Sequence, residues 1–185
     1  TAGAPFAWWV AAPYVSGALL LLFVGILDDR KGLSAATKLA AQVVAALPIL
    51  MLDGFPLLPA LLPAWVSHAG TLFWFLAVVN AFNLVDGLDG LMGSVALICA
   101  LAFATMAWSW NLTDAVFILA ILIGALVGFL RWNLPRAATF AGDGGSLMVG
   151  YLLAAASLRV ASVDGGANPE APLRALLALF LILSI

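Results

Sequence analysis

Long apolar runs, each about the length of a membrane-crossing helix, follow one another along the chain and are separated by short polar segments. A helix needs about 20 mostly apolar residues to cross a hydrocarbon core of roughly 30 Å. The pattern predicts six full spans and the start of a seventh near residue 173; the six lie at 8–27, 35–52, 62–81, 91–108, 115–132 and 145–162. We therefore expect an all-α fold, a polytopic transmembrane helix bundle.

The composition supports this class and excludes others. Hydrophobic residues make up 65% of the chain, charged residues make up 9%, and the mean hydropathy is +1.18, which is incompatible with an ordinary soluble domain. The lipid bilayer is therefore an expected partner. The formal net charge of -2 offers no basic surface for nucleic acid, so we expect no nucleic-acid partner.

The two ends of the chain predict that it is part of a larger protein. Residues 181–185 lie in an apolar run that has not reached the length of a full span, and residue 1 is not a methionine. A half-span would leave backbone amides without partners in lipid. We interpret residues 1–185 as a single transmembrane domain, a fragment of a longer chain.

The basic residues predict an orientation, because Lys and Arg are retained on the cytoplasmic side of a membrane. Five of the seven basic residues flank the first and fifth polar segments: Arg30, Lys31, Lys38, Arg131 and Arg136. With alternating spans, the polar segment at 82–90 falls on the same side. We therefore expect all three segments to be cytoplasmic.

Aspartates gather in three clusters on this predicted cytoplasmic side. Five of the nine acidic residues belong to them: Asp28, Asp29, Asp86, Asp89 and Asp143. Acids that served only as helix caps would not need to share one side of the membrane. The clusters therefore predict a shared catalytic site.

In the first cluster, Asp28 and Asp29 end an apolar run. Acids at the carboxyl end of a helix oppose its dipole at about 0.3 to 1 kcal/mol each, so a compensating cation is expected. Adjacent helical residues point about 100° apart, which predicts different partners: a metal for one, and a substrate proton or the ammonium of Lys31 or Lys38 for the other. The alternative is a solvated helix end neutralised by Arg30 and Lys31.

The second cluster places a polar residue at every third position: Asn80, Asn83, Asp86 and Asp89. This spacing lines one side of a helix end with amides and carboxylates. Polar groups within a membrane are costly enough to indicate a functional site. The alternative, a turn rich in Asn and Asp between two spans, does not explain the two asparagines.

The third cluster joins Asn133 to the segment Phe140-Ala141-Gly142-Asp143-Gly144-Gly145-Ser146. An aspartate flanked by glycines just before an apolar helix places a metal ligand beside free amides, which suits a diphosphate bridged by Mg²⁺. Phe140 could stack on a planar base. The alternative is a loop followed by an ordinary helix N-cap at Asp143 or Ser146.

In this order, the motifs resemble those of the polyprenyl-phosphate N-acetylhexosamine-1-phosphate transferases (glycosyltransferase family 4), over residues 20–160. The resemblance implies a bundle of ten or eleven helices in the bacterial inner (plasma) membrane, with its active site facing the cytoplasm. It also implies transfer of a sugar 1-phosphate from a UDP-sugar to undecaprenyl phosphate with release of UMP, the step that initiates cell-envelope polysaccharides.

The resemblance also implies roles for individual residues. Asp143 is expected to bind Mg²⁺ (or Mn²⁺) directly, and Asp28 and Asp29 are expected at the metal site and in deprotonating or positioning the lipid phosphate. The remaining residues are expected to bind substrate, with Phe140 near the uracil and the two lysines on phosphate: Asn83, Asp86, Asp89, Asn133, Phe140, Lys31 and Lys38.

The family includes enzymes that transfer phospho-N-acetylmuramoyl-pentapeptide, which carry a long insertion between the aspartate pair and Lys-Gly-Leu-Ser. This insertion is missing here, so UDP-GlcNAc is the expected donor. A homodimer is compatible with the sequence. Two other classes remain as alternatives: a transporter, although its charges should lie inside the spans, and a catalytically inactive scaffold homologue.

Overall fold

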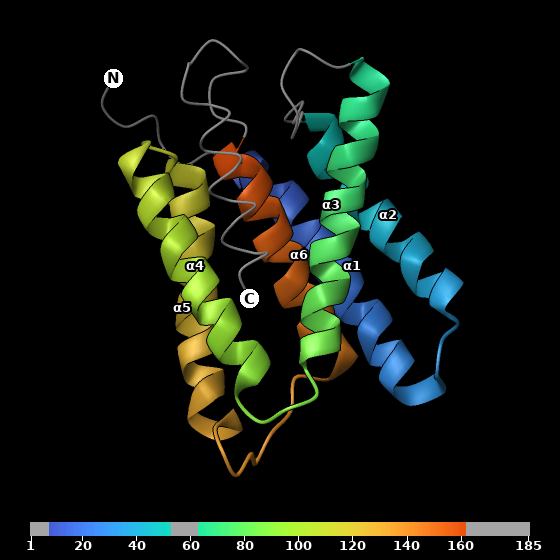
Figure 1. The fold of residues 1–185 in the computed structure, drawn as a ribbon, viewed down its shortest axis with the longest axis vertical. Coiled ribbons are helices and arrows are strands. Elements are labelled where there is room, and N and C mark those ends of the chain that lie inside the picture. The colour runs from blue at the N-terminus through green and yellow to red at the C-terminus, as the bar shows by residue number, and fades with distance from the viewer. Residues whose placement is uncertain (1–7, 53–62, 162–185) are drawn as a thin grey trace.

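The computed structural model describes residues 8–52 and 63–161, which form six α-helices without any strand (Figure 1). The helices are α1 (Trp8–Lys31), α2 (Ala35–Leu52), α3 (Ala64–Val85), α4 (Leu91–Ser109), α5 (Thr113–Asn133) and α6 (Gly142–Ala161). The all-α prediction is confirmed. The seventh span predicted near residue 173 lies outside the described residues.

Three helices extend into the acidic clusters. Helix α1 ends at Lys31 rather than at residue 27, α3 ends at Val85 rather than at residue 81, and α6 begins at Gly142 rather than at residue 145. The prediction ended each span where the apolar run ends, but backbone hydrogen bonds continue a helix into its polar terminal turn. Asp28, Asp29 and Asp143 therefore lie on helical turns, where their positions are well defined.

Five of the described helices are long and apolar enough to cross a membrane, which identifies the chain as a multi-pass membrane protein. Helix α2 differs from the prediction of six full spans, because only a shorter apolar helix, Ala35–Met51, is found there. At 1.5 Å per residue, the 18 residues of the whole helix α2 (Ala35–Leu52) cover about 27 Å, slightly less than the hydrocarbon core.

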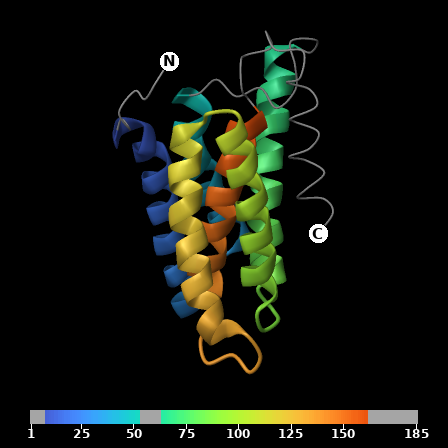
Figure 2. The same cartoon turned by 90° about the vertical axis from the view of Figure 1, so that its left-hand side faces the viewer.

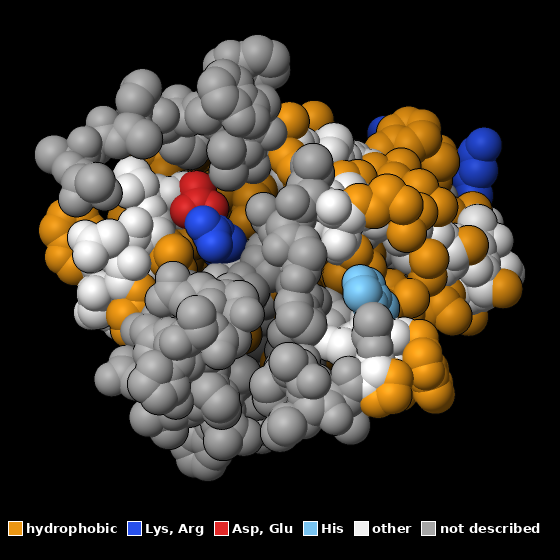
Figure 3. All heavy atoms as spheres, turned by 90° about the horizontal axis from the view of Figure 1, so that it is seen from above, with side chains coloured by type: hydrophobic (Ala, Val, Ile, Leu, Met, Phe, Trp, Pro, Cys, Tyr) orange, Lys and Arg blue, Asp and Glu red, His pale blue; other side chains and the backbone are white. Residues whose placement is uncertain are grey.

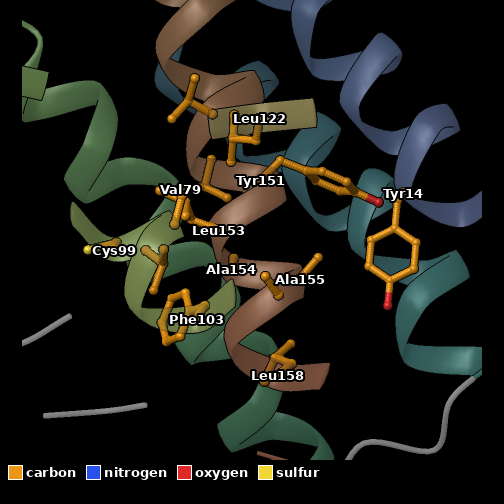
Figure 4. Close-up of a cluster of buried hydrophobic side chains, with 14 of the residues drawn as sticks. Tyr14, Val79, Cys99, Phe103, Leu122, Tyr151, Leu153, Ala154, Ala155 and Leu158 are labelled. Carbon is orange, nitrogen blue, oxygen red and sulfur yellow. The ribbon is translucent and has the colours of Figure 1, made fainter. Parts of the chain in front are cut away.

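Helix α6 forms the centre of the bundle and packs against α1, α3, α4 and α5. Small and medium-sized residues, including Ala154 and Ala155, are buried along it (Figure 4). The Tyr151 hydroxyl donates a hydrogen bond of 2.8 Å to the Pro13 carbonyl, and its ring lies edge-on to Phe75 at 5.3 Å. Because α6 is surrounded by its neighbours, its amino end is held in a fixed place among them.

Three connections meet at one end of the bundle. The α1–α2, α3–α4 and α5–α6 connections, at 32–34, 86–90 and 134–141, all lie toward the lower end in Figure 1, and Figure 2 shows the last two at this end from another side. These connections adjoin the three aspartate clusters. The three clusters therefore lie at one end of the bundle, as expected, and the cytoplasmic position of this end stays a prediction.

The opposite end carries one described ion pair. The described surface there is mainly hydrophobic (Figure 3). Arg159 near the end of α6 donates from Nε to Asp114 Oδ2 on α5 at 2.7 Å, and both side chains are partly buried. The pair joins two helices far from the aspartate clusters.

We expect Asp114→Asn to lower the thermal unfolding midpoint in detergent by a few degrees. Loss of a partly exposed ion pair costs about 1 kcal/mol, which for a protein of this size shifts the midpoint by roughly 2 to 4 °C. The measurement is tryptophan fluorescence against temperature for both proteins. An unchanged midpoint would mean that the pair contributes no stability.

Candidate active site

Two glycines bring the first and third clusters together. A Cβ atom built on Gly25 of α1 would lie 2.4 Å from both the Cα and the N of Gly144 on α6. Only residues without side chains allow two helix backbones to approach this closely. The contact lies one turn before Asp28 and directly after Asp143, so it brings these carboxylates to the same place.

Lys38 connects the two carboxylates. Its Nζ lies 2.6 Å from Asp28 Oδ2 and 3.0 Å from Asp143 Oδ2. The Asp28 side chain is only 8% exposed and also accepts a hydrogen bond from the Leu33 amide. The expected cation for the aspartate pair is therefore Lys38, which reaches it from the first turn of α2.

Asn83 supplies a second contact to Asp143. Its Nδ2 donates to Asp143 Oδ1 and to Ser146 Oγ, at 2.9 Å each. The Ser146 hydroxyl is buried and donates in turn to the Gly142 carbonyl at 2.9 Å. Both oxygens of Asp143 are thus held by donors from α2 and α3, which fixes the orientation of the carboxylate.

Asp29 contacts the amino end of α6. Its Oδ1 accepts a hydrogen bond of 3.0 Å from the Asp143 amide, one of the first amides of that helix. Gly142 has a φ of +60°, and a Cβ there would lie 2.7 Å from Asp29 Oδ2. The glycine before Asp143 is thus needed both for its backbone conformation and for the space that Asp29 occupies.

Asp86 lies near the same carboxylates, just past the end of α3. Burial, and then the negative charges of Asp143 and Asp29, raise the pKa of Asp86 to about 6. A cation among these groups would favour the ionised form of Asp86. We refer to Asp28, Asp29, Asp86 and Asp143 as the carboxylate cluster.

Two predicted substrate-binding residues join the connections to one another. Asn133 is buried; its Oδ1 accepts from the Gly90 amide at 3.0 Å and its Nδ2 donates to the Thr139 carbonyl at 2.8 Å. Asp89 Oδ2 accepts from the Ala137 amide at 3.0 Å. In this structure both side chains hold the α3–α4 and α5–α6 connections together, and their contact with substrate stays a prediction.

Two further predicted residues lie at the margin of the cluster. Phe140 is 70% exposed on the α5–α6 connection, so most of its ring is open to a planar ligand. Lys31 is exposed at the end of α1, and the described residues include no ion pair for it. Roles for both residues in substrate binding stay predictions.

The carboxylate cluster offers oxygen ligands of the type that Mg²⁺ prefers. Within residues 8–52 and 63–161, no three Asp, Glu, His or Cys side chains are grouped so as to hold a metal alone. Mg²⁺ is usually held by one or two carboxylates together with water and substrate phosphates, rather than by a complete protein cage. Asp143 in the first turn of α6 and Asp29 in the last turn of α1 lie next to each other and fit this mode of binding.

Some residues of this network were not predicted to be site residues. Gln42 and Asn80 form a hydrogen-bonded pair one turn away from Lys38 and Asn83, and Ser146 accepts from Asn83. Asn80 belonged to the recurring polar positions, but its partner could not be identified from spacing. The contact of Gly25 with Gly144 could not be identified from the sequence either, because it depends on how α1 crosses α6.

Known proteins with similar sequences point to one family. The family model of glycosyl transferase family 4 matches residues 11–161. The "Probable undecaprenyl-phosphate N-acetylglucosaminyl 1-phosphate transferase" of Bacillus subtilis is 36% identical over 149 residues, which cover 77% of this chain and 42% of that protein. The decaprenyl-phosphate N-acetylglucosaminephosphotransferase of Mycobacterium tuberculosis (strain CDC 1551 / Oshkosh) is 35% identical over 201 residues, which cover 98% of this chain and 49% of that protein.

A second type of relative is similar to a comparable degree. The phospho-N-acetylmuramoyl-pentapeptide-transferase of Clostridium acetobutylicum is 33% identical over 153 residues, which cover 73% of this chain and 48% of that protein. The chain thus spans less than half the length of each of these curated relatives. The family match includes all six described helices in whole or in part, together with the carboxylate cluster. This chain belongs to glycosyl transferase family 4.

Proposed function

We propose that the protein containing this chain transfers an N-acetylhexosamine 1-phosphate from a UDP-sugar to a polyprenyl phosphate. The observation that carries the proposal is the network around Asp143. The Lys38 ammonium and the Asn83 amide contact this side chain at the amino end of a central helix. Asp28 shares the ammonium, and Asp29 accepts a hydrogen bond from the Asp143 backbone amide. Such an arrangement suits a diphosphate that reacts with another phosphate.

The proposed reaction is a phosphoryl transfer without net oxidation. An oxygen of the polyprenyl phosphate attacks the phosphorus that carries the sugar, the bond to the bridging oxygen breaks, and UMP leaves with that oxygen. The product is a polyprenyl diphosphate sugar. Catalysis of such a transfer depends mainly on in-line positioning and on neutralising negative charge.

In the proposal, different residues of the chain contribute positioning, proton uptake and charge neutralisation. Lys38 offers a positive charge to phosphate oxygens, and Asn83 holds Asp143 in a fixed orientation. Asp28 or Asp29 takes up the proton of the lipid phosphate or orients it. Asp143, with Asp29 beside it, would hold Mg²⁺, and the bound ion would supply charge neutralisation to the diphosphate.

The membrane arrangement agrees with a lipid acceptor. The carboxylate cluster lies where apolar helices end, so a lipid phosphate at the membrane surface can reach it while its chain stays among the helices. The excess of Lys and Arg at this end supports a cytoplasmic orientation in a bacterial plasma membrane. UDP-sugars are then supplied from the same compartment.

UDP-GlcNAc is the proposed donor, and undecaprenyl phosphate is the proposed acceptor. Relatives whose names specify N-acetylglucosamine support this choice, together with the short connection at 32–34 between α1 and α2. Such a transfer would initiate a cell-envelope polysaccharide. Phe140, exposed beside the cluster, is the proposed contact for uracil.

The test is UMP release by the full-length protein in lipid. We expect release from UDP-GlcNAc only when undecaprenyl phosphate is present, with appearance of the lipid-linked sugar in equal amount. UDP-GalNAc and UDP-MurNAc-pentapeptide serve as competing donors that decide the sugar. A folded protein that releases no UMP from any of the three donors would refute the proposal and favour a transporter or an inactive scaffold instead.

A further inference from the structure

Gln42 of α2 and Asn80 of α3 form a reciprocal amide pair. Gln42 Nε2 donates to Asn80 Oδ1 at 3.2 Å, and Asn80 Nδ2 donates to Gln42 Oε1 at 2.7 Å. Asn80 Nδ2 also donates to the Leu76 carbonyl of its own helix at 2.7 Å. Gln42 is 1% exposed, whereas Asn80 is partly exposed, so the glutamine side of the pair is buried.

The pair lies directly behind two residues that hold Asp143. Gln42 follows Lys38 by four positions on α2, and Asn80 precedes Asn83 by three positions on α3. Residues at these spacings lie on neighbouring positions of one helix surface, about 6 Å and 4.5 Å apart along the axis. The same two helices are therefore joined once through the amide pair and again through Asp143.

The reciprocal geometry defines one register between the helices. A shift of α2 along α3 by one residue would move Gln42 by about 1.5 Å and break at least one of the two hydrogen bonds. In an apolar environment an amide left without its partner costs about 1 to 3 kcal/mol. The favoured register is the one in which Lys38 reaches both Asp28 and Asp143.

We infer that Gln42 and Asn80 are positioning residues for sugar-phosphate transfer. They set the register of α2 against α3, so that Lys38 and Asn83 meet the Asp143 carboxylate from two sides. Neither amide touches substrate. This inference rests on the proposed function for its effect on rate, but its effect on Lys38 can be measured without any activity.

Another buried hydrogen bond provides a comparison. Trp74 Nε1 on α3 donates to Ser157 Oγ on α6 at 3.1 Å, and both residues are buried. Trp74 lies six residues before Asn80 on α3, about 9 Å farther from the carboxylate cluster along that helix. Ser157→Ala removes a buried interhelical bond without touching the register of α2, so it is the matched control.

The first experiment compares Gln42→Met, Ser157→Ala and the unaltered full-length protein. Methionine keeps the length and volume of glutamine but cannot bond to Asn80. We expect kcat of Gln42→Met to fall about tenfold, the lower end of the loss seen when partners of a metal ligand are removed. KM for UDP-GlcNAc should change little, and Ser157→Ala should keep its kcat.

A double variant tests whether the pair itself matters. Gln42→Asn with Asn80→Gln exchanges the two amides and keeps their combined length, so the reciprocal bonds can form again. We expect this variant to recover most of kcat, whereas Gln42→Asn alone should resemble Gln42→Met. Failure of the double variant to exceed the single one would overturn the positioning role.

The second experiment measures acylation of the Lys38 amine by mass spectrometry at fixed pH. In the present register this amine is enclosed by two carboxylates. We expect several-fold faster labelling in Gln42→Met and an unchanged rate in Ser157→Ala. This result would support the inference even if the protein released no UMP, whereas equal labelling in all three proteins would overturn it.

Discussion

Asp143→Asn is expected to lower UMP release by the full-length protein about 1000-fold. The substitution keeps the shape of the side chain, so Asn83 can still donate to its oxygen. The variant loses the negative charge that faces Lys38 at 3.0 Å and that would bind Mg²⁺. Loss of about 4 kcal/mol of charge stabilisation in the transition state corresponds to this factor.

The measurement is single-turnover UMP release across a range of Mg²⁺ concentrations. We expect the variant to need more Mg²⁺ for its remaining activity, because the substitution weakens one of the two proposed metal ligands. Asp114→Asn, an identical change at the opposite end of the bundle, should keep the rate of the unaltered protein. A variant at Asp143 that retains a tenth of the rate would remove this residue from the metal site.

The general fold could be predicted because membrane helices are defined by the length of their apolar runs. All six described helices overlap their predicted spans. The polar ends could not be placed from hydropathy, because a helix continues as long as its backbone hydrogen bonds do. Asp29 appeared to follow a span, whereas it belongs to the last turn of α1 and contacts the Asp143 amide.

Motif order identified the carboxylate cluster, but it did not identify the contacts within it. Lys31 and Lys38 were equally suitable cations for Asp28, since both follow it closely in sequence. The connection at 32–34 turns α2 back along α1, and this brings Lys38 to the carboxylates while Lys31 stays exposed. Such a choice depends on the path of the chain in three dimensions.

Individual polar residues also took roles that spacing does not reveal. The four positions from Asn80 to Asp89 were expected to line one side of a helix end. In the structure three of them contact different elements, because α3 ends at Val85 and the chain then turns: Asn80 contacts Gln42 of α2, Asn83 contacts Asp143 of α6, and Asp89 contacts the Ala137 amide of the α5–α6 connection. Partner choice follows from helix packing, which a single sequence does not contain.

Gly25→Ala is expected to reduce the activity about 100-fold and to destabilise the protein by about 1 to 3 kcal/mol. The new Cβ would lie 2.4 Å from backbone atoms of Gly144, which cannot rotate away, so α1 must move off α6. Overpacking of a fitted contact has this energetic cost. A displacement of about 1 Å between Asp28 and Asp143 is enough for the loss of rate.

The same substitution in α5 separates this effect from any general effect of alanine. Gly124 has no atom within 4 Å of a Cβ built on it, so Gly124→Ala meets open space and gains helix propensity of about 1 kcal/mol. We expect this control to keep its rate and its thermal midpoint, or to raise the midpoint slightly. Both variants are compared by UMP release and by thermal unfolding in detergent. Equal activity of the two would mean that the close approach of α1 to α6 is not what brings the aspartates together.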